Sequence, residues 1–435
     1  MTDLVKSDAE LALIDLARRV LPGGSFGNLP GDIVIREGRG GRVWDMSGNE
    51  YVDFLLGSGP MFVGHAHPEV LAAVQAQLPR GFTFFANNEY GIRLAAELVD
   101  AVPCAEQVRF FSSGTEADAY AMRLARAFRK RDKILKFEGG FHGMSDYALM
   151  SFAPKRPGNF PQASPDSAGI PHSVQTEMLI APFNDAAIGC ELIREHRDEL
   201  AGVIMEPFQR VIAPVPGFLQ AIREVTAECG IPLIFDEVVT GFRFAWGGAQ
   251  EYYGVKPDIC TLGKIIGGGF PLSAVAASAE IMAHFDRARC GDDGFIPQIG
   301  TLSGNPVAAA AGLATLAVLK RPGTYEKVFA TGRALMQGIA RIIEETGLPA
   351  QVIGEPPLFD LAYARTAPRD YRATLRADTE LHRRINQRLR AAGVLKGDSK
   401  FYVSLAHDAA DVEHVLAAFR SAAQAETMAK APETA

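Results

Sequence analysis

A single lysine, Lys264, lies between an apolar run typical of a buried strand (residues 259–262) and three consecutive glycines (residues 267–269). An ammonium group beside a buried strand end is unfavourable unless a partner balances its charge or a reaction uses the amine. The glycines leave room for a flat ligand next to the backbone. Lys264 is therefore a candidate to form a Schiff base with a carbonyl cofactor. The alternative is a surface lysine beside a loop.

The segment Ser112-Ser113-Gly114-Thr115-Glu116 stands between a predicted strand and a predicted helix. The free N–H groups of a first helical turn and the positive end of the helix dipole attract anions. Gly114 would let the backbone approach such an anion, and the hydroxyls of Ser113 and Thr115 could donate hydrogen bonds to it. An ordinary N-cap, with Ser113 and Glu116 as a capping box, is the alternative.

Asp236 follows the apolar run at 232–235, and a carboxylate buried there needs a partner. It could hold the protonated nitrogen of a pyridine ring through a charge-assisted hydrogen bond. Val238 points to the same face and could pack on such a ring, and Phe141 could stack on the opposite side. The alternatives are a helix cap or an ion pair with Arg243 for the carboxylate, and core packing for the two apolar side chains.

Three further polar residues are candidates to bind the same ligand. Glu206 follows the apolar run at 201–205, and His142 comes directly after Phe141. Thr301 precedes an alanine-rich helix and could add a hydroxyl to a bound anion. The alternative is a helix start capped by Ser303 or Asn305.

Each of these signals is weak alone, but together they describe one ligand. A phosphate site, a carboxylate for a ring nitrogen, groups that stack on a ring, and a lysine that captures an aldehyde are what pyridoxal phosphate requires. The chain therefore has the components of a site for this cofactor.

The elements that must position these residues repeat as strand, loop and helix from about residue 108 to 319. The short strand-like runs are apolar throughout, which is typical of strands buried on both faces of a parallel sheet. Ligands of such α/β folds bind beyond the carboxyl ends of the strands. Ser113, Glu206, Asp236 and Lys264 all follow such runs.

The remainder of the chain predicts a second, smaller α+β domain. A helix at 4–21 and strands at 33–36, 42–46 and 51–55 precede the α/β region. Helices at about 324–346, 377–392 and 411–423 and strands at about 350–354, 358–363 and 401–405 follow it, with a frayed tail from about 425. We therefore expect a large ligand-binding domain at 56–320 and a small domain built from 1–55 and 321–435. The proline-rich stretch 153–176 is either a lid or a surface loop.

The composition of the 435 residues is that of a soluble globular protein, with 48% hydrophobic and 22% charged residues. A net charge of −7 argues against nucleic-acid or anionic-membrane partners. There is no apolar run of about 20 residues to span a membrane and no signal-peptide pattern. Five scattered cysteines indicate a reducing compartment, so we expect a cytoplasmic protein. His65 and His67 have no further ligands at a suitable spacing, so no metal site is expected.

The ordered motifs along the chain resemble those of the class III, fold-type I pyridoxal phosphate aminotransferases, and most of all those of the glutamate-1-semialdehyde aminomutase group. The resemblance extends from about residue 10 to 423 and is carried by the segments 59–70, 113–117, 136–143, 235–243, 261–269, 300–306 and 404–407.

This resemblance implies roles for the candidate residues. Lys264 would be the Schiff-base lysine, and Asp236 would pair with the pyridine nitrogen. Val238 and Phe141 would enclose the ring. The phosphate would be held by Ser113, Gly114 and Thr115. Thr301 would reach the phosphate of a neighbouring subunit, which implies a homodimer with shared active sites.

Three departures from the aminomutase pattern affect the substrate pocket. Ser58 replaces an aromatic residue, the loop 25–30 lacks a carboxylate-binding arginine, and Ser399 replaces a glutamate. We therefore expect an aminotransferase that moves an amino group between an amine or amino acid and a keto acid. An aminomutase, which moves the amine within one molecule, is the alternative. A non-enzymatic protein that only binds the cofactor is a third hypothesis.

Overall fold

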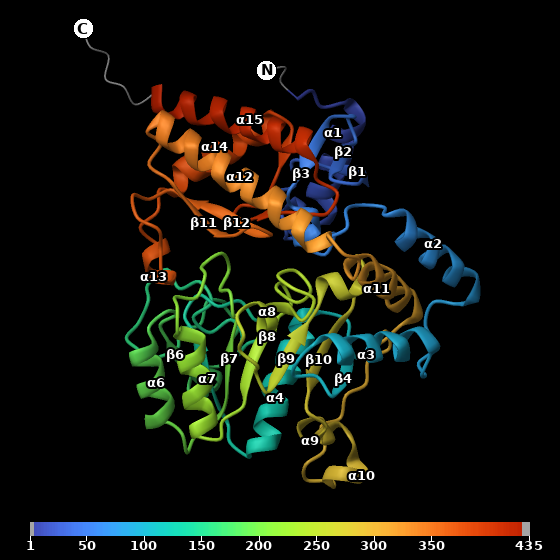
Figure 1. Ribbon diagram of the computed structural model, residues 1–435, viewed down its shortest axis with the longest axis vertical. Coiled ribbons are helices and arrows are strands. Elements are labelled where there is room, and N and C mark those ends of the chain that lie inside the picture. Colours follow the sequence, from blue (N-terminus) through green and yellow to red (C-terminus); the bar gives the residue numbers. More distant parts are fainter. Residues whose placement is uncertain (1–3, 429–435) are drawn as a thin grey trace. The chain divides into compact units, whose positions relative to one another are not determined.

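The computed structural model describes residues 4–428, and its chain divides into two compact units. The small unit contains the chain up to Pro68 together with Gly323–Ala367 and the part that follows residue 376. The large unit contains Glu69–Pro322 and Pro368–Arg376 (Figure 1). The first boundary thus lies at Pro68 rather than at residue 55, and a short segment of the C-terminal region belongs to the large unit.

A seven-stranded sheet forms the centre of the large unit, in the order β4-β10-β9-β8-β7-β5-β6. β10 is antiparallel to both of its neighbours, and the other pairs are parallel. The sheet is therefore mixed but mostly parallel, as the apolar strand patterns predict. Its strands are β4 (Gln107–Phe111), β5 (Lys133–Phe137), β6 (Met178–Ala181), β7 (Leu200–Met205), β8 (Leu233–Glu237), β9 (Ile259–Leu262) and β10 (Ser273–Ala277).

Two of these strands, β6 and β10, were not predicted from the sequence. The β10 segment Ser-Ala-Val-Ala-Ala is rich in alanine, which has a low strand propensity, so only its position between two strands explains its conformation.

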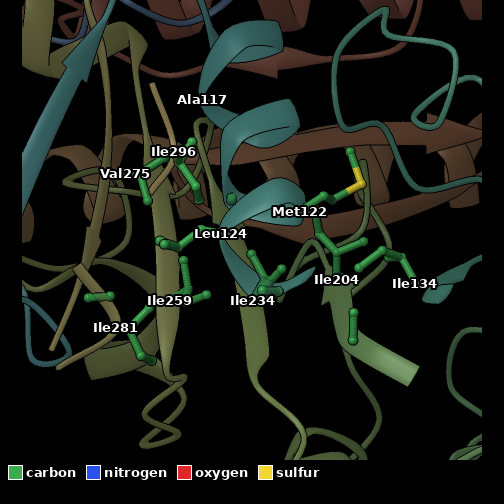
Figure 2. Packing of buried hydrophobic residues seen from close by; sticks show 14 of the residues in the cluster. Ala117, Met122, Leu124, Ile134, Ile204, Ile234, Ile259, Val275, Ile281 and Ile296 are labelled. Atoms are coloured by element: carbon green, nitrogen blue, oxygen red, sulfur yellow. The ribbon is translucent and has the colours of Figure 1, made fainter. Parts of the chain in front are cut away.

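Helices flank this sheet, as Figure 1 shows for α6 and α7. Helix α4 packs against β7, β9 and β10, and Figure 2 shows its Met122 and Leu124 among isoleucines of the sheet. The helices of the large unit are α2 (Pro68–Gln77, which begins at the unit boundary), α3 (Glu89–Ala101), α4 (Gly114–Arg129), α5 (His172–Gln175), α6 (Ala186–Glu195), α7 (Phe218–Glu228), α8 (Gly248–Tyr252), α9 (Ala279–Met282), α10 (Arg287–Cys290), α11 (Pro306–Leu319) and α13 (Tyr371–Thr374).

The small unit is α+β, as predicted. An antiparallel meander of β1 (Ile35–Arg39), β2 (Arg42–Asp45) and β3 (Glu50–Asp53) is extended by β13 (Val394–Leu395), which pairs in parallel with β3. A second sheet joins β11 (Gln351–Glu355), β12 (Leu358–Ala362) and β14 (Phe401–Tyr402). Helix α15 packs on α12 and α14, and the helices are α1 (Asp8–Val20), α12 (Thr324–Thr346), α14 (Thr379–Ala391) and α15 (Ala409–Met428). The tail that was expected to fray from about 425 is still helical as far as Met428.

The segment Pro368–Arg376 holds part of the large unit together. Arg372 donates two hydrogen bonds to the buried carboxylate of Glu138, at 2.7 and 3.1 Å, and one to the Gly158 carbonyl at 2.6 Å. Its guanidinium also lies 4.1 Å from the centre of the Phe160 ring. These contacts fix the beginning of the proline-rich stretch 153–176 against the core of this unit.

Within residues 4–428, no helix is both long and apolar enough to cross a membrane.

Candidate active site

The sequence-predicted site residues of the large unit follow neighbouring strands. β5, β7, β8 and β9 run parallel, and β4 has the same direction because β10 is antiparallel to both β4 and β9. Their carboxyl ends therefore lie along one edge of the sheet. Glu206, Asp236 and Lys264 stand at the ends of β7, β8 and β9, and Ser113 follows β4.

Val238 shows how closely two of these ends approach. A Cβ atom added at Gly114 would lie 3.0 Å from Val238 Cγ1, and one added at Gly263 would lie 3.0 Å from the same atom. The start of α4 and the residue before Lys264 thus both pack against this one side chain. The structure brings the predicted anion site, the predicted ring-packing residue and the candidate nucleophile together.

Asp236 is 5% exposed and has three donors around its carboxylate. His142 Nδ1 lies 2.8 Å from Oδ2. The Val238 N–H donates to Oδ1 at 3.1 Å, and Thr261 Oγ1 lies 3.3 Å from Oδ1. These donors orient the carboxyl group.

Lys264 adopts a left-handed backbone conformation, with φ of 50°, at the first position of the 3-10 helix Lys264–Gly267. A non-glycine residue in this region costs free energy and is maintained only by its surroundings. Such strain is concentrated at functional sites.

The start of α4 is both a capping box and a potential anion site. Ser113 Oγ accepts from the Glu116 N–H, and the Glu116 carboxylate accepts from the N–H groups of Ser112 and Ser113 at 2.8 and 3.0 Å. The alternative interpretation of Ser113 is thus confirmed as a structural role. The N–H groups of Gly114 and Thr115 belong to the first turn and have no partner within the helix, so they remain available to an anion.

Phe141 and His142 belong to the loop after β5, which packs on this helix start. The Met144 N–H donates to Thr115 Oγ1 at 3.2 Å. Gly143 has φ of +81°, and a Cβ there would lie 2.5 Å from Thr115 Cα, so both the conformation and the space require glycine. The loop and the start of α4 therefore form one surface.

Glu206 holds the same loop in place. Its Oε2 accepts from the Phe141 N–H at 2.9 Å, and its Oε1 accepts from the Arg210 N–H at 3.4 Å. The Arg210 guanidinium lies 4.9 Å from the centre of the Phe141 ring and 5.0 Å from that of Phe152. Glu206 thus contacts the backbone that carries Phe141. The contact between Arg210 and the Phe141 ring was not predicted from the sequence, because no local pattern links an arginine to a ring in a distant loop.

Asp118 is a second buried carboxyl that the sequence did not single out. Its Oδ1 lies 2.7 Å from Thr261 Oγ1. Burial, and then the negative charge of Asp236, raise the pKa of Asp118 well above its ordinary value. The one available signal is an acid within the apolar face of α4, next to Ala117 and before Ala121 and Met122.

In the described part of the chain, no hydrogen bond joins Thr301 to the other site residues. It is exposed, and its carbonyl accepts a hydrogen bond from Thr83 at 3.0 Å. The helix start after it is capped by Asn305, whose side chain accepts from the Ala308 N–H at 2.9 Å.

Comparison with known proteins assigns the chain to a family. The sequence profile described as "Aminotransferase class-III" matches residues 26–420. The chain belongs to the class III aminotransferase family. Among solved structures, it is similar to an omega-transaminase from Sphaerobacter thermophilus, with 37% identity, a TM-score of 0.91 and coverage of 96% of this chain and 97% of the other.

Two further structures show the range of this likeness. A transaminase solved with PLP bound is 30% identical, with a TM-score of 0.88 and coverage of 98% of this chain and 99% of the other. A glutamate-1-semialdehyde-aminomutase from Pseudomonas aeruginosa PAO1 is 26% identical, with a TM-score of 0.85 and coverage of 95% and 94%. This class III chain therefore has the fold-type I architecture and is a pyridoxal phosphate-dependent aminotransferase.

The residues present fit this cofactor. The carboxylate of Asp236 is held in place by His142, the Val238 N–H and Thr261. Nε2 of His142 is buried without a hydrogen-bond partner among the described residues, so it could form a hydrogen bond with a bound ligand. Gly114 and Gly263 both pack closely against Val238, so the start of α4 and the residue before Lys264 meet at this side chain. The hydroxyls of the exposed Ser113 and half-buried Thr115 lie at a helix start suited to a phosphate.

Proposed function

We propose that Lys264 binds the cofactor as a Schiff base and carries the proton of the transamination. Bound pyridoxal phosphate supplies an aldehyde that condenses with amines and a ring that accepts electrons from the bond that breaks. Once an incoming amine has released it, the Lys264 Nζ would take the proton from the substrate carbon and hold it for its return to the cofactor. The position of Lys264 at the end of β9, beside the residues that fit the cofactor, carries this proposal.

The other residues of the site bind and orient. Asp236 would hold the ring nitrogen in its protonated form, and His142 would keep that carboxylate in place. Phe141 and Val238 would enclose the ring. Ser113, Gly114 and Thr115 would bind the phosphate, and Glu206 would support the loop that carries Phe141.

The substrates are an amine or amino acid and a keto acid, as in the family. The omega-transaminase likeness and the lack of an arginine in the loop 25–30 favour transamination between two molecules. An aminomutase is the second candidate, supported by the 26% identical enzyme from Pseudomonas aeruginosa. A single amino compound converted without any added keto acid would indicate the aminomutase reaction. Strict dependence on 2-oxoglutarate or pyruvate would indicate transamination.

A homodimer is the second part of this proposal. Ile299 is 82% exposed and Phe85 is 70% exposed, and exposed apolar side chains that gather on a surface mark interaction sites. The hydrogen bond between Thr83 and Thr301 ties the two segments that carry them. Thr301 lies next to this apolar patch, which consists of Phe82, Phe84, Phe85, Ile299 and Leu302. In a dimer formed through the patch, Thr301 would reach the phosphate site of the second copy, as the family resemblance implies.

The cytoplasm is the proposed location. All five cysteines are free, which supports a reducing compartment.

The test of the catalytic assignment uses two lysines on either side of β9. We expect Lys264→Ala to abolish turnover of amine and keto acid pairs, and borohydride reduction of the wild-type enzyme to attach the cofactor to the peptide that contains Lys264. The control, Lys256→Ala, changes an exposed lysine before β9 and should leave turnover intact. Full activity of the Lys264→Ala enzyme would refute the assignment.

A further inference from the structure

Two buried carboxyl groups lie close to one hydroxyl in the large unit. Asp118, on α4, is 2% exposed, and Asp236, at the end of β8, is 5% exposed. Thr261 Oγ1, on β9, lies 2.7 Å from Asp118 Oδ1 and 3.3 Å from Asp236 Oδ1. The proposed function uses only Asp236, so Asp118 needs a separate explanation.

Counting hydrogens favours a proton on one of the two carboxyl groups. The Thr261 hydroxyl has a single hydrogen and two carboxyl oxygens within reach. If both acids were ionised, this hydrogen could serve only one of the two contacts, the other contact would bring two oxygen atoms together with no hydrogen between them, and two negative charges would share a buried site. A proton on Asp118 removes both problems. Asp118 then donates to Thr261 Oγ1, and Thr261 donates to Asp236.

Burial, the charge of Asp236 and the hydrogen-bond partners favour this proton on Asp118 rather than on Asp236, against the opposing charge of Lys264. The charged groups that face Asp118 are Asp236 on β8 and Lys264 after β9. Asp236 receives further hydrogen-bond donors from His142 and from the Val238 N–H, whereas Asp118 lies within the apolar face of α4. Burial and the charge of Asp236 raise the pKa of Asp118 accordingly.

We propose that Asp118 is a positioning residue that remains protonated and acts through Thr261 to fix Asp236 as a carboxylate directed at the ring nitrogen of the cofactor. This inference rests on the proposed role of Asp236. The inference predicts that position 118 must provide a neutral hydrogen-bond donor and that a negative charge there is not required.

The test compares variants that separate the donor from the charge. Asp118→Asn keeps an N–H donor of the same size and removes the acid, whereas Asp118→Leu removes the donor. Thr261→Ser keeps the hydroxyl, and Thr261→Val removes it without changing the size. The full-length enzymes are titrated with pyridoxal phosphate to measure the dissociation constant, and the absorption spectrum of the bound cofactor is recorded.

We expect Asp118→Asn and Thr261→Ser to retain the wild-type affinity and spectrum. Asp118→Leu and Thr261→Val should weaken binding roughly five- to tenfold, the effect of one lost hydrogen bond, and should change the spectrum. If Asp118→Leu does not fold, the two Thr261 variants and Asp118→Asn decide the question. Equal losses in Asp118→Asn and Asp118→Leu, or wild-type binding by Thr261→Val, would overturn the inference.

Asp236→Asn separates a failure of this inference from a failure of the proposed function. If Asp236→Asn weakens cofactor binding while Thr261→Val does not, only the role of Asp118 is wrong. If Asp236→Asn itself binds pyridoxal phosphate with wild-type affinity and spectrum, the assignment of Asp236 fails as well, and the inference fails with it.

Discussion

Replacing Arg372 with methionine should loosen the loop that carries Phe141. Arg372 pairs with Glu138, which is 4% exposed and lies three residues before Phe141. Methionine retains an apolar stem against Phe160 but has no donors. The variant therefore leaves a buried carboxylate and the Gly158 carbonyl without their guanidinium partner.

The size of the effect follows from the burial of the two partners. Breaking a fully buried ion pair by removing one member costs about 3–5 kcal/mol, whereas a surface pair contributes about 0–1 kcal/mol. The side chain of Glu138 is 5% exposed and that of Arg372 is 38% exposed, so the pair lies between these limits. We expect a loss of about 2–3 kcal/mol, which is a roughly 30- to 140-fold change in a local opening equilibrium.

Hydrogen exchange of the intact enzyme, read by mass spectrometry, measures that opening. Amides in residues 138–144 and 153–160 should exchange faster by the factor given above, and the affinity for pyridoxal phosphate should fall. The matched control is Arg383→Met, because Arg383 forms an exposed pair with Glu380 on α14. Glu138→Gln combined with Arg372→Met should recover part of the loss, since no buried charge then remains. Wild-type exchange of both segments in the single Arg372 variant would refute the reasoning.

Two further variants test a buried charge and the proposed dimer. Burial lowers the pKa of Lys136 to about 7 from 10.5, so the folded state binds fewer protons than the unfolded state and stability rises with pH across this interval. Lys136→Met should flatten this rise in melting temperature between pH 7 and 10, and an unchanged slope would contradict the assignment. Ile299→Asp should shift the enzyme toward a monomer in size-exclusion chromatography by weakening association at least about tenfold. Leu11→Asp, on the small unit, is the control, and equal elution of both variants with the wild type would exclude the patch as an interface.

The residues at strand ends were predictable because their signal is local. An apolar run followed by one polar residue is visible in the sequence around Asp236 and Lys264. The parallel arrangement of β7, β8 and β9 then places their carboxyl ends at one edge. The predicted α+β character of the small unit is confirmed for the same reason, since its helices and strands have clear periodicities.

The residues that support the site could not be predicted, because their partners are distant in sequence. Asp118 and Thr261 meet only when α4 packs on β9, and Arg372 reaches Glu138 across 234 positions. The local sequence does not show whether a buried acid has a distant hydrogen-bond partner of this kind or has none. Likewise, β13 consists of two residues and exists only because β3 offers a free edge.

The segment Pro368–Arg376 belongs to the large unit but is translated long after the rest of it, which matters for folding during synthesis on the ribosome. A nascent chain that has emerged as far as Pro322 already contains all seven strands of the large sheet, but it lacks Arg372. The carboxylate of Glu138 therefore has no guanidinium partner until Arg372 has been synthesised and has left the ribosome. The cofactor loop therefore acquires its final rigidity late, and a fragment ending before 368 should accept pyridoxal phosphate poorly even though it carries Lys264.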